Sequence, residues 1–277
     1  MTQRIDTLAE IASAYDAIVF DQWGVLHNGT APYSGAVDCL VDLANAGTPL
    51  ALLSNSGKRT VPNAARIAQM GFALELFARI MTSGEVLWRD IDEGKISQAR
   101  FFAIERSAGD AEAWAKGLAI ELTDLGNAQA ILLMGLPDGA QLADWHTHLN
   151  YARDAGLPVY CSNPDRQSPR ADGLVISPGA LAFCYAEMGG HVTFYGKPHR
   201  RIFDTLSSVL GATRVLMVGD SLEHDISGAQ AAGWDSLLVQ GGLYATEFAH
   251  ADHDAVLASL VTSKGCRPPT YSIEVLA

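Results

Sequence analysis

Features that would tie this chain to a membrane or to nucleic acid are scarce in its sequence. No apolar run approaches the ~20 residues that span a bilayer, and the N-terminal segment MTQRIDTLAE is charged, without the apolar core of a secretory signal. Only 19 lysines and arginines stand against 31 aspartates and glutamates, a formal net charge of -12. A nucleic-acid-binding face needs a local excess of basic residues. We therefore expect a soluble, cytoplasmic protein that binds neither membranes nor nucleic acid.

Cysteine is also scarce, and its spacing carries no metal or redox motif. No two of the four cysteines form a CxxC pair, so the sequence predicts no zinc centre and favours reduced, mostly buried thiols. The cysteines are Cys39, Cys161, Cys184 and Cys266. Hydrophobic residues make up 48% of the chain and charged residues 18%, values typical of a globular protein. A length of 277 residues suits one large domain or two modest ones.

Both ends of the chain alternate apolar runs, polar loops and amphipathic segments. The first three apolar runs each end at a polar segment, and an expected helix closed by glycine follows each of them. The expected strands are 17–20, 49–53, 214–218 and 236–240, and the expected helices are 35–46, 61–70 and 225–232. Continuous apolar strands alternating with helices predict right-handed βαβ units in a buried parallel sheet. The predicted fold class is therefore α/β, with a doubly wound, Rossmann-like sheet.

The middle of the chain has a character of its own. Its expected strands are 100–104, 130–134 and 158–161, and its expected helices are 109–117 and 140–155. The simplest topology forms a catalytic core from residues 1–85 and 183–277. A second, smaller α/β domain is then inserted at residues 86–182.

Three of the expected core strands end in polar residues: Asp21, Ser54 and Asp220. In an open parallel sheet, ligands bind at the carboxyl ends of the strands, near the switch point of the topology. Two carboxylates in one crevice repel each other unless a cation lies between them, and hard oxygen ligands select Mg²⁺. Lys197, just before an expected helix, would balance the charge of a phosphate. Ser54 and backbone N–H groups would hold the phosphate oxygens.

In this order, the polar segments resemble the four motifs of the haloacid dehalogenase-like superfamily. The segments are Asp21-Gln22-Trp23-Gly24-Val25, Ser54-Asn55, Gly196-Lys197-Pro198, and Gly219-Asp220-Ser221 with Asp225. Residues 21–54 leave room for one helix and one strand, whereas residues 54–197 leave room for a domain. That spacing resembles the subfamily with an α/β cap between its second and third motifs. Members include p-nitrophenyl, pyridoxal, sugar- and nucleotide-phosphate phosphatases.

The resemblance implies a Mg²⁺-dependent phosphatase that acts on a small phosphorylated metabolite through an aspartyl-phosphate intermediate. Asp21 would be the catalytic nucleophile and a metal ligand. The other metal ligands would be Asp220 and the backbone carbonyl of Trp23. Asn163 and Asp165 would lie in the cap, near the substrate. By analogy with the family we also expect a homodimer formed through the cap.

The resemblance assigns the phosphate to a second group of residues. Ser54, Asn55 and Lys197 would bind the phosphoryl oxygens, and Lys197 would also be catalytic because it neutralises their charge. Asp225 would orient Lys197 or a metal-bound water from behind.

One residue departs from the family pattern. Family phosphatases carry a second aspartate two residues after the nucleophile, as general acid and then base, and here that residue is Trp23. An indole cannot exchange a proton at neutral pH, so we expect a slow enzyme, or one that selects its leaving group. His27 is a candidate substitute acid.

The missing aspartate leaves other functions open. The chain could be a phosphate-binding or regulatory pseudo-phosphatase of the same fold. Dehalogenases and phosphonatases of the superfamily also lack this aspartate, but their caps follow the first motif. A phosphonatase further needs a cap lysine, and neither Lys95 nor Lys116 stands in a recognisable motif. A receiver-type signalling domain orders similar residues but needs no insertion of this size.

Overall fold

The computed structural model describes residues 2–170, 173–249 and 252–276. The chain divides into two compact units. The first comprises Met1–Ser54, Ala64–Met81 and Lys197–Ala277, and the second comprises Asn55–Asn63 and Thr82–Gly196.

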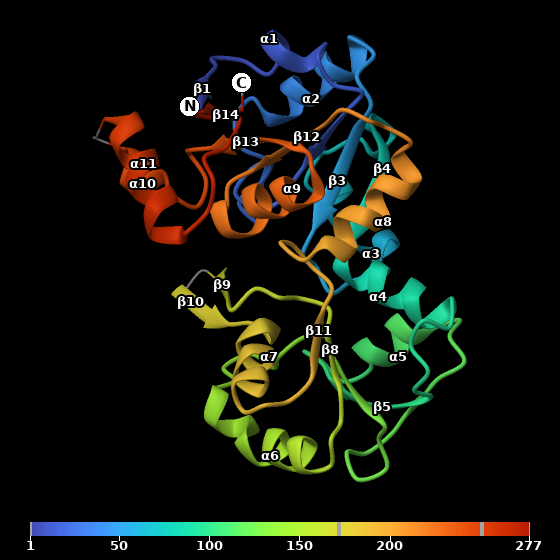
Figure 1. Cartoon of the computed structure of the whole chain (residues 1–277). Coiled ribbons are helices and arrows are strands. Elements are labelled where there is room, and N and C mark those ends of the chain that lie inside the picture. Colours follow the sequence, from blue (N-terminus) through green and yellow to red (C-terminus); the bar gives the residue numbers. More distant parts are fainter. Residues whose placement is uncertain (1, 171–172, 250–251, 277) are drawn as a thin grey trace. The chain divides into compact units, whose positions relative to one another are not determined.

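The first unit is built on a seven-stranded sheet. Its strands, in spatial order, are β1 (Gln3–Arg4), β14 (Tyr271–Ile273), β13 (Asp235–Val239), β12 (Val215–Gly219), β2 (Ala17–Phe20), β3 (Leu50–Ser54) and β4 (Phe77–Thr82). In Figure 1 the blue N-terminal strands and the orange C-terminal strands lie in one sheet. β2 pairs in parallel with both β3 and β12. The chain therefore runs outward in opposite directions from β2 and β12, which makes their junction the switch point of the sheet.

Helices cover both faces of this sheet, as the distribution of buried residues along β13 demonstrates. Leu237 and Val239 belong to the core that holds helices α1 (Ala9–Ala12) and α2 (Ala36–Asn45). Leu238, between them, belongs to the core of α10 (Ala245–Phe248) and α11 (His253–Lys264). Neighbouring side chains of a strand point to opposite faces. The remaining segments are α3 (Thr60–Gln69), whose residues 60–63 belong to the second unit, a 3₁₀ turn (Leu74–Leu76), α8 (Arg200–Leu210), a π-helix (Leu222–Ile226) and α9 (Ser227–Ala232).

The second unit has a five-stranded parallel sheet and a separate hairpin. The sheet order is β11 (Val192–Phe194), β8 (Val159–Cys161), β7 (Ala130–Leu133), β5 (Arg100–Ile104) and β6 (Glu121–Leu122), and the hairpin strands are β9 (Gln167–Arg170) and β10 (Gly173–Ile176). The helices are α4 (Ser83–Asp92), α5 (Asp110–Ala115), a 3₁₀ turn (Leu142–Trp145), α6 (His146–Asp154) and α7 (Pro178–Glu187). The predicted fold class, a doubly wound parallel sheet with a smaller α/β unit, is confirmed.

The division expected from the sequence differs from these two units at both boundaries. The second unit begins at Thr82 rather than at residue 86, and it also contains Asn55–Asn63. The expected boundary between residues 182 and 183 falls inside α7, whereas the second unit continues to Gly196. The physical reason is β11, which is hydrogen-bonded in parallel to β8 and so extends the second sheet. Among the described residues, no helix has the length and apolar character needed to cross a bilayer.

Candidate active site

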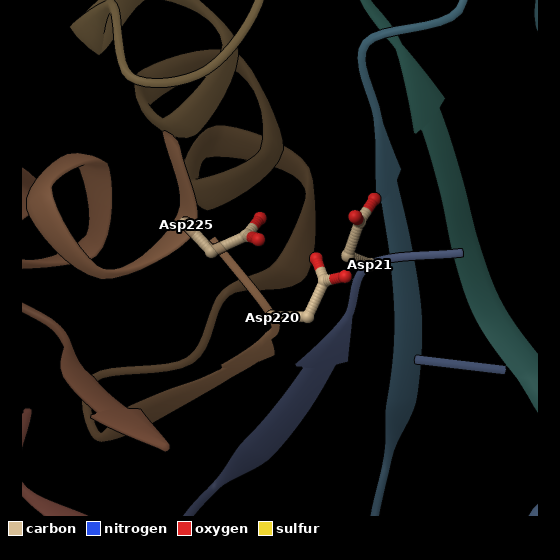
Figure 2. A group of neighbouring side chains, drawn as sticks. All are labelled: Asp21, Asp220 and Asp225. Atoms are coloured by element: carbon tan, nitrogen blue, oxygen red, sulfur yellow. The ribbon is translucent and has the colours of Figure 1, made fainter. Parts of the chain in front are cut away.

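Three carboxylates of the first unit converge at the switch point of its sheet. Asp21 directly follows β2, Asp220 directly follows β12, and Asp225 lies in the π-helix that comes next. Each contributes an oxygen to a group in which all three atoms lie within 4.8 Å of one another. Figure 2 shows the three side chains converging beyond the ends of the strands. The pairing of β2 with β12, residue for residue up to Phe20 and Val218, is what brings Asp21 and Asp220 together.

Lys197 supplies the positive charge of this cluster. Its ammonium lies 2.6 Å from Asp21 Oδ1 and 2.6 Å from Asp225 Oδ1, and the side chain is only 2% exposed. Burial by itself would lower the pKa of Lys197, but the carboxylates of Asp21 and Asp225 outweigh that effect and raise it. Lys197 is therefore a fixed cation at neutral pH.

One lysine does not balance three carboxylates. Burial raises the pKa of the Asp21 carboxyl to about 7, against the lowering effect of Lys197. Burial also raises the pKa of Asp220, and the charges of Asp21 and Asp225 add to that rise. Both shifts come first from burial, and the charge of a neighbouring carboxylate adds to each of them. Three neighbouring carboxylates with one lysine among them leave negative charge that a divalent cation would neutralise. The residues present therefore suit the Mg²⁺ that the sequence predicted.

Asp220 is held by two loops that sequence reasoning missed. The N–H of Leu243 donates a hydrogen bond of 2.9 Å to Asp220 Oδ2. On the other side, Gly24 has φ +81°, and a side chain there would overlap Asp220 Oδ2. The backbone of Gly242 packs against both Asp220 and the carbonyl of Gly24. Gly24 stands in the first motif, and the signal for the other loop was the Gly241-Gly242 pair, which begins two residues after the end of β13.

Substituting Gly24 tests this support of Asp220. Gly24→Ala would push a methyl group into the Asp220 carboxylate, so we expect its affinity for a divalent cation to fall by at least about tenfold, or roughly 1.4 kcal/mol. Calorimetric titration with Mg²⁺ or Mn²⁺ measures the change. The matched control is Gly47→Ala, where φ is +84° but nothing lies within 4 Å of the added methyl. Both variants lose stability because alanine is strained in the left-handed backbone conformation. Unchanged metal affinity in Gly24→Ala would contradict the support of Asp220 by this loop.

The residues predicted to bind phosphate are divided between the two units. Ser54, the buried last residue of β3, belongs to the first unit with Asp21 and Lys197. Asn55 belongs to the second unit, where its side-chain amide donates a hydrogen bond of 2.7 Å to Asp165 Oδ1. Asn163 joins the same group, because its Oδ1 accepts a 2.9 Å hydrogen bond from the N–H of Asp165. The structure thus brings Asn55, Asn163 and Asp165 together.

The segment after Asp21 places Trp23 and His27 in opposite environments. Trp23 is 37% exposed, a high value for such a large apolar side chain. The imidazole of His27 is fully buried beside Phe72, and its Nδ1 accepts a 3.0 Å hydrogen bond from the N–H of Gly29. Burial lowers the pKa of His27 to about 4. A buried, neutral imidazole is poorly suited to protonate a leaving group, so His27 does not fit the role of substitute acid.

Comparison with known proteins identifies related sequences along nearly the whole chain. The family model described as haloacid dehalogenase-like hydrolase matches residues 18–118, and the model described as HAD-hydrolase-like matches residues 194–263. Chronophin of Bos taurus is 27% identical and covers 98% of this chain and 94% of its own. Glycerol-3-phosphate phosphatase of Gallus gallus is 27% identical, over 87% of this chain and 85% of its own length. A haloacid dehalogenase-like hydrolase from Brucella suis, known from its crystal structure, is 29% identical in sequence. The match covers 99% of this chain and 100% of that chain, with a TM-score of 0.83.

Proposed function

Because this chain belongs to the haloacid dehalogenase-like superfamily of hydrolases, we propose that it is a Mg²⁺-dependent phosphatase of small phosphorylated molecules, with Asp21 as its nucleophile. The observation that carries the proposal is the cluster of Asp21, Asp220 and Asp225 around the buried Lys197, at the switch point of the sheet. The similarity to a curated glycerol-3-phosphate phosphatase supports the same class of reaction.

The residues of the first unit divide into a metal group and a phosphate group. Asp21, Asp220 and the backbone carbonyl of Trp23 would hold Mg²⁺. When bound, the ion would neutralise charge on the phosphoryl oxygens and lower the repulsion between phosphate and carboxylates. Lys197 and Ser54 would hold the phosphoryl oxygens from the protein side. Asp225, 2.6 Å from the ammonium of Lys197, would keep that cation in position.

The reaction would proceed in two displacements at phosphorus. A carboxylate oxygen of Asp21 attacks the phosphorus atom, the bond from phosphorus to the ester oxygen breaks, and the leaving group departs with the bonding electrons. Water then attacks the phosphorus of the aspartyl-phosphate, the bond to Asp21 breaks, and phosphate is released. The proton of that water passes to solvent or to the released phosphate. Lys197 faces Asp21 throughout and stabilises the charge that develops on the transferred group.

Trp23 determines which substrates this site would turn over. An indole donates only a weakly acidic N–H and accepts no proton. The leaving group must therefore depart as a stable anion, as aryl and acyl phosphates do, whereas a sugar phosphate must expel a basic alkoxide. The second displacement is also slow without a base. We expect a slow enzyme that favours good leaving groups.

The second unit would act as the cap of such an enzyme. Asn163 and Asp165, linked to Asn55 by hydrogen bonds, are proposed to face the substrate. By analogy with the family, this unit would also carry a homodimer interface.

A phosphate-release assay with a panel of esters tests the proposal. We expect turnover of acetyl phosphate and p-nitrophenyl phosphate that requires Mg²⁺ and stops with a chelator, and slower turnover of glycerol 3-phosphate. The second candidate, a pseudo-phosphatase that binds phosphate, is favoured by the indole in place of the acid. Tight binding of phosphate or vanadate without turnover of any ester would support it and would rule out the enzyme.

A further inference from the structure

We propose that Trp23 and Leu243 form an apolar platform beside the carboxylate cluster and that this platform binds an aromatic leaving group of the substrate. The proposal rests on the phosphatase function above and names the substrate class as phosphate esters of a flat aromatic or heteroaromatic ring. Both side chains are exposed, Trp23 by 37% and Leu243 by 51%. Exposed apolar side chains next to a polar site are a common feature of ligand pockets.

The two residues lie on the two loops that flank Asp220. Trp23 stands two residues after Asp21 and next to Gly24, whose backbone lies against the Asp220 carboxylate. Leu243 donates its N–H to Asp220 Oδ2. The loops also contact each other, because a side chain at Gly242 would come within 2.5 Å of the Gly24 carbonyl oxygen. Trp23 and Leu243 are therefore each one residue away from a contact between the loops, at the edge of the carboxylate cluster.

The indole is held in place by its own loop. A Cβ atom at Gly29 would lie 3.3 Å from Trp23 Nε1 and 3.6 Å from Trp23 Cδ1, so the ring lies directly against the Gly29 backbone. The backbone of Leu243 is fixed in turn by its hydrogen bond to Asp220. Because these contacts fix the indole and the backbone of Leu243, less conformational entropy is lost when a ligand binds.

The chemistry of the platform selects a flat, weakly hydrated ring. Stacking on an aromatic side chain is favourable for any planar π system, and an aliphatic neighbour adds apolar contact at the ring edge. A sugar or glycerol group, which is strongly hydrated, gains nothing from these surfaces. Trp23, which stands in place of the general acid, would thus also favour esters whose leaving groups depart without a proton.

Binding of two phosphonates separates stacking from leaving-group chemistry. Phenylphosphonate and methylphosphonate carry the same charged head and neither is an ester, so only the apolar group differs. In calorimetric titrations with Mg²⁺ present, we expect phenylphosphonate to bind wild-type protein about tenfold more tightly, or roughly 1.4 kcal/mol. Trp23→Ala should remove most of this preference and Leu243→Ala part of it, whereas Trp23→Phe should retain it. Affinity for methylphosphonate is the reference in each variant: the preference is the ratio of the two affinities in the same protein, and binding of methylphosphonate reports that the site is folded.

Tyr151→Ala is the matched control, because it removes an exposed aromatic side chain from the second unit. It should keep the full preference for phenylphosphonate. Equal affinity of wild-type protein for both phosphonates, or a preference that survives in Trp23→Ala, would overturn the platform and leave the phosphatase proposal standing. If neither phosphonate binds, the proposed phosphate site and the platform are both wrong.

Discussion

Asp21→Asn is expected to lower metal-dependent phosphate release by on the order of 10⁴-fold or more, because it replaces the carboxylate that attacks phosphorus with an amide. An amide oxygen is a far weaker nucleophile than a carboxylate and carries no charge for the metal. The change preserves the volume of the side chain, and it removes a partly buried carboxylate that is crowded by Asp225 and that in turn crowds Asp220. The variant should therefore fold at least as well as the wild type, which thermal unfolding can verify.

The control for this substitution is the same change at an exposed aspartate. Asp204→Asn, on α8, removes an exposed carboxylate that forms a surface ion pair with Arg200. We expect its phosphate release to equal that of the wild type. If Asp21→Asn kept more than about a tenth of wild-type activity, Asp21 would not be the nucleophile.

Trp23→Asp is expected to raise turnover of glycerol 3-phosphate by about 10- to 100-fold. A general acid contributes roughly 10²–10⁴ in rate, and only part of that should return because the surrounding loop has not been adapted to a carboxyl group. The gain should be small for acetyl phosphate, whose leaving group departs without a proton. Initial rates of phosphate release from the two substrates, with saturating Mg²⁺, provide the measurement.

Trp23→Asn separates proton transfer from the removal of a bulky ring. Asparagine has nearly the same shape as aspartate but transfers no proton, so we expect no gain with glycerol 3-phosphate. An equal gain in both variants would mean that the indole blocks access. An unchanged rate in Trp23→Asp would contradict the view that the missing acid limits alkyl esters.

Two carboxylates of the cluster, Asp21 and Asp220, could be predicted from the sequence because their positions follow from the strands. The apolar runs ending at Phe20 and Val218 are buried at every position, so they had to lie in the middle of a parallel sheet. The polar residues that follow central parallel strands meet at one edge. Asp21 and Asp220 needed no other information. Ser54 at the end of β3 follows from the same rule.

Contacts between loops distant in sequence could not be predicted in this way. The hydrogen bond from Leu243 to Asp220 and the packing of Gly24 against the same carboxylate depend on loop conformations that carry no periodic pattern. The same is true of the hydrogen bond between Asn55 and Asp165. The burial of His27 was also hidden, because a histidine beside an Asn-Gly turn suggests exposure, whereas its ring lies in the core against Phe72.

The central claim, that Asp21 accepts the phosphoryl group, is tested most directly by acid quenching during turnover of acetyl phosphate. Because Trp23 provides no base for the second displacement, the aspartyl-phosphate should accumulate, and intact-protein mass spectrometry should find one added phosphoryl group. Peptide mapping should locate it at Asp21, and Asp21→Asn should remain unmodified. Turnover of the wild type with no phosphorylated protein at any time, or a phosphoryl group still present on Asp21→Asn, would contradict the account.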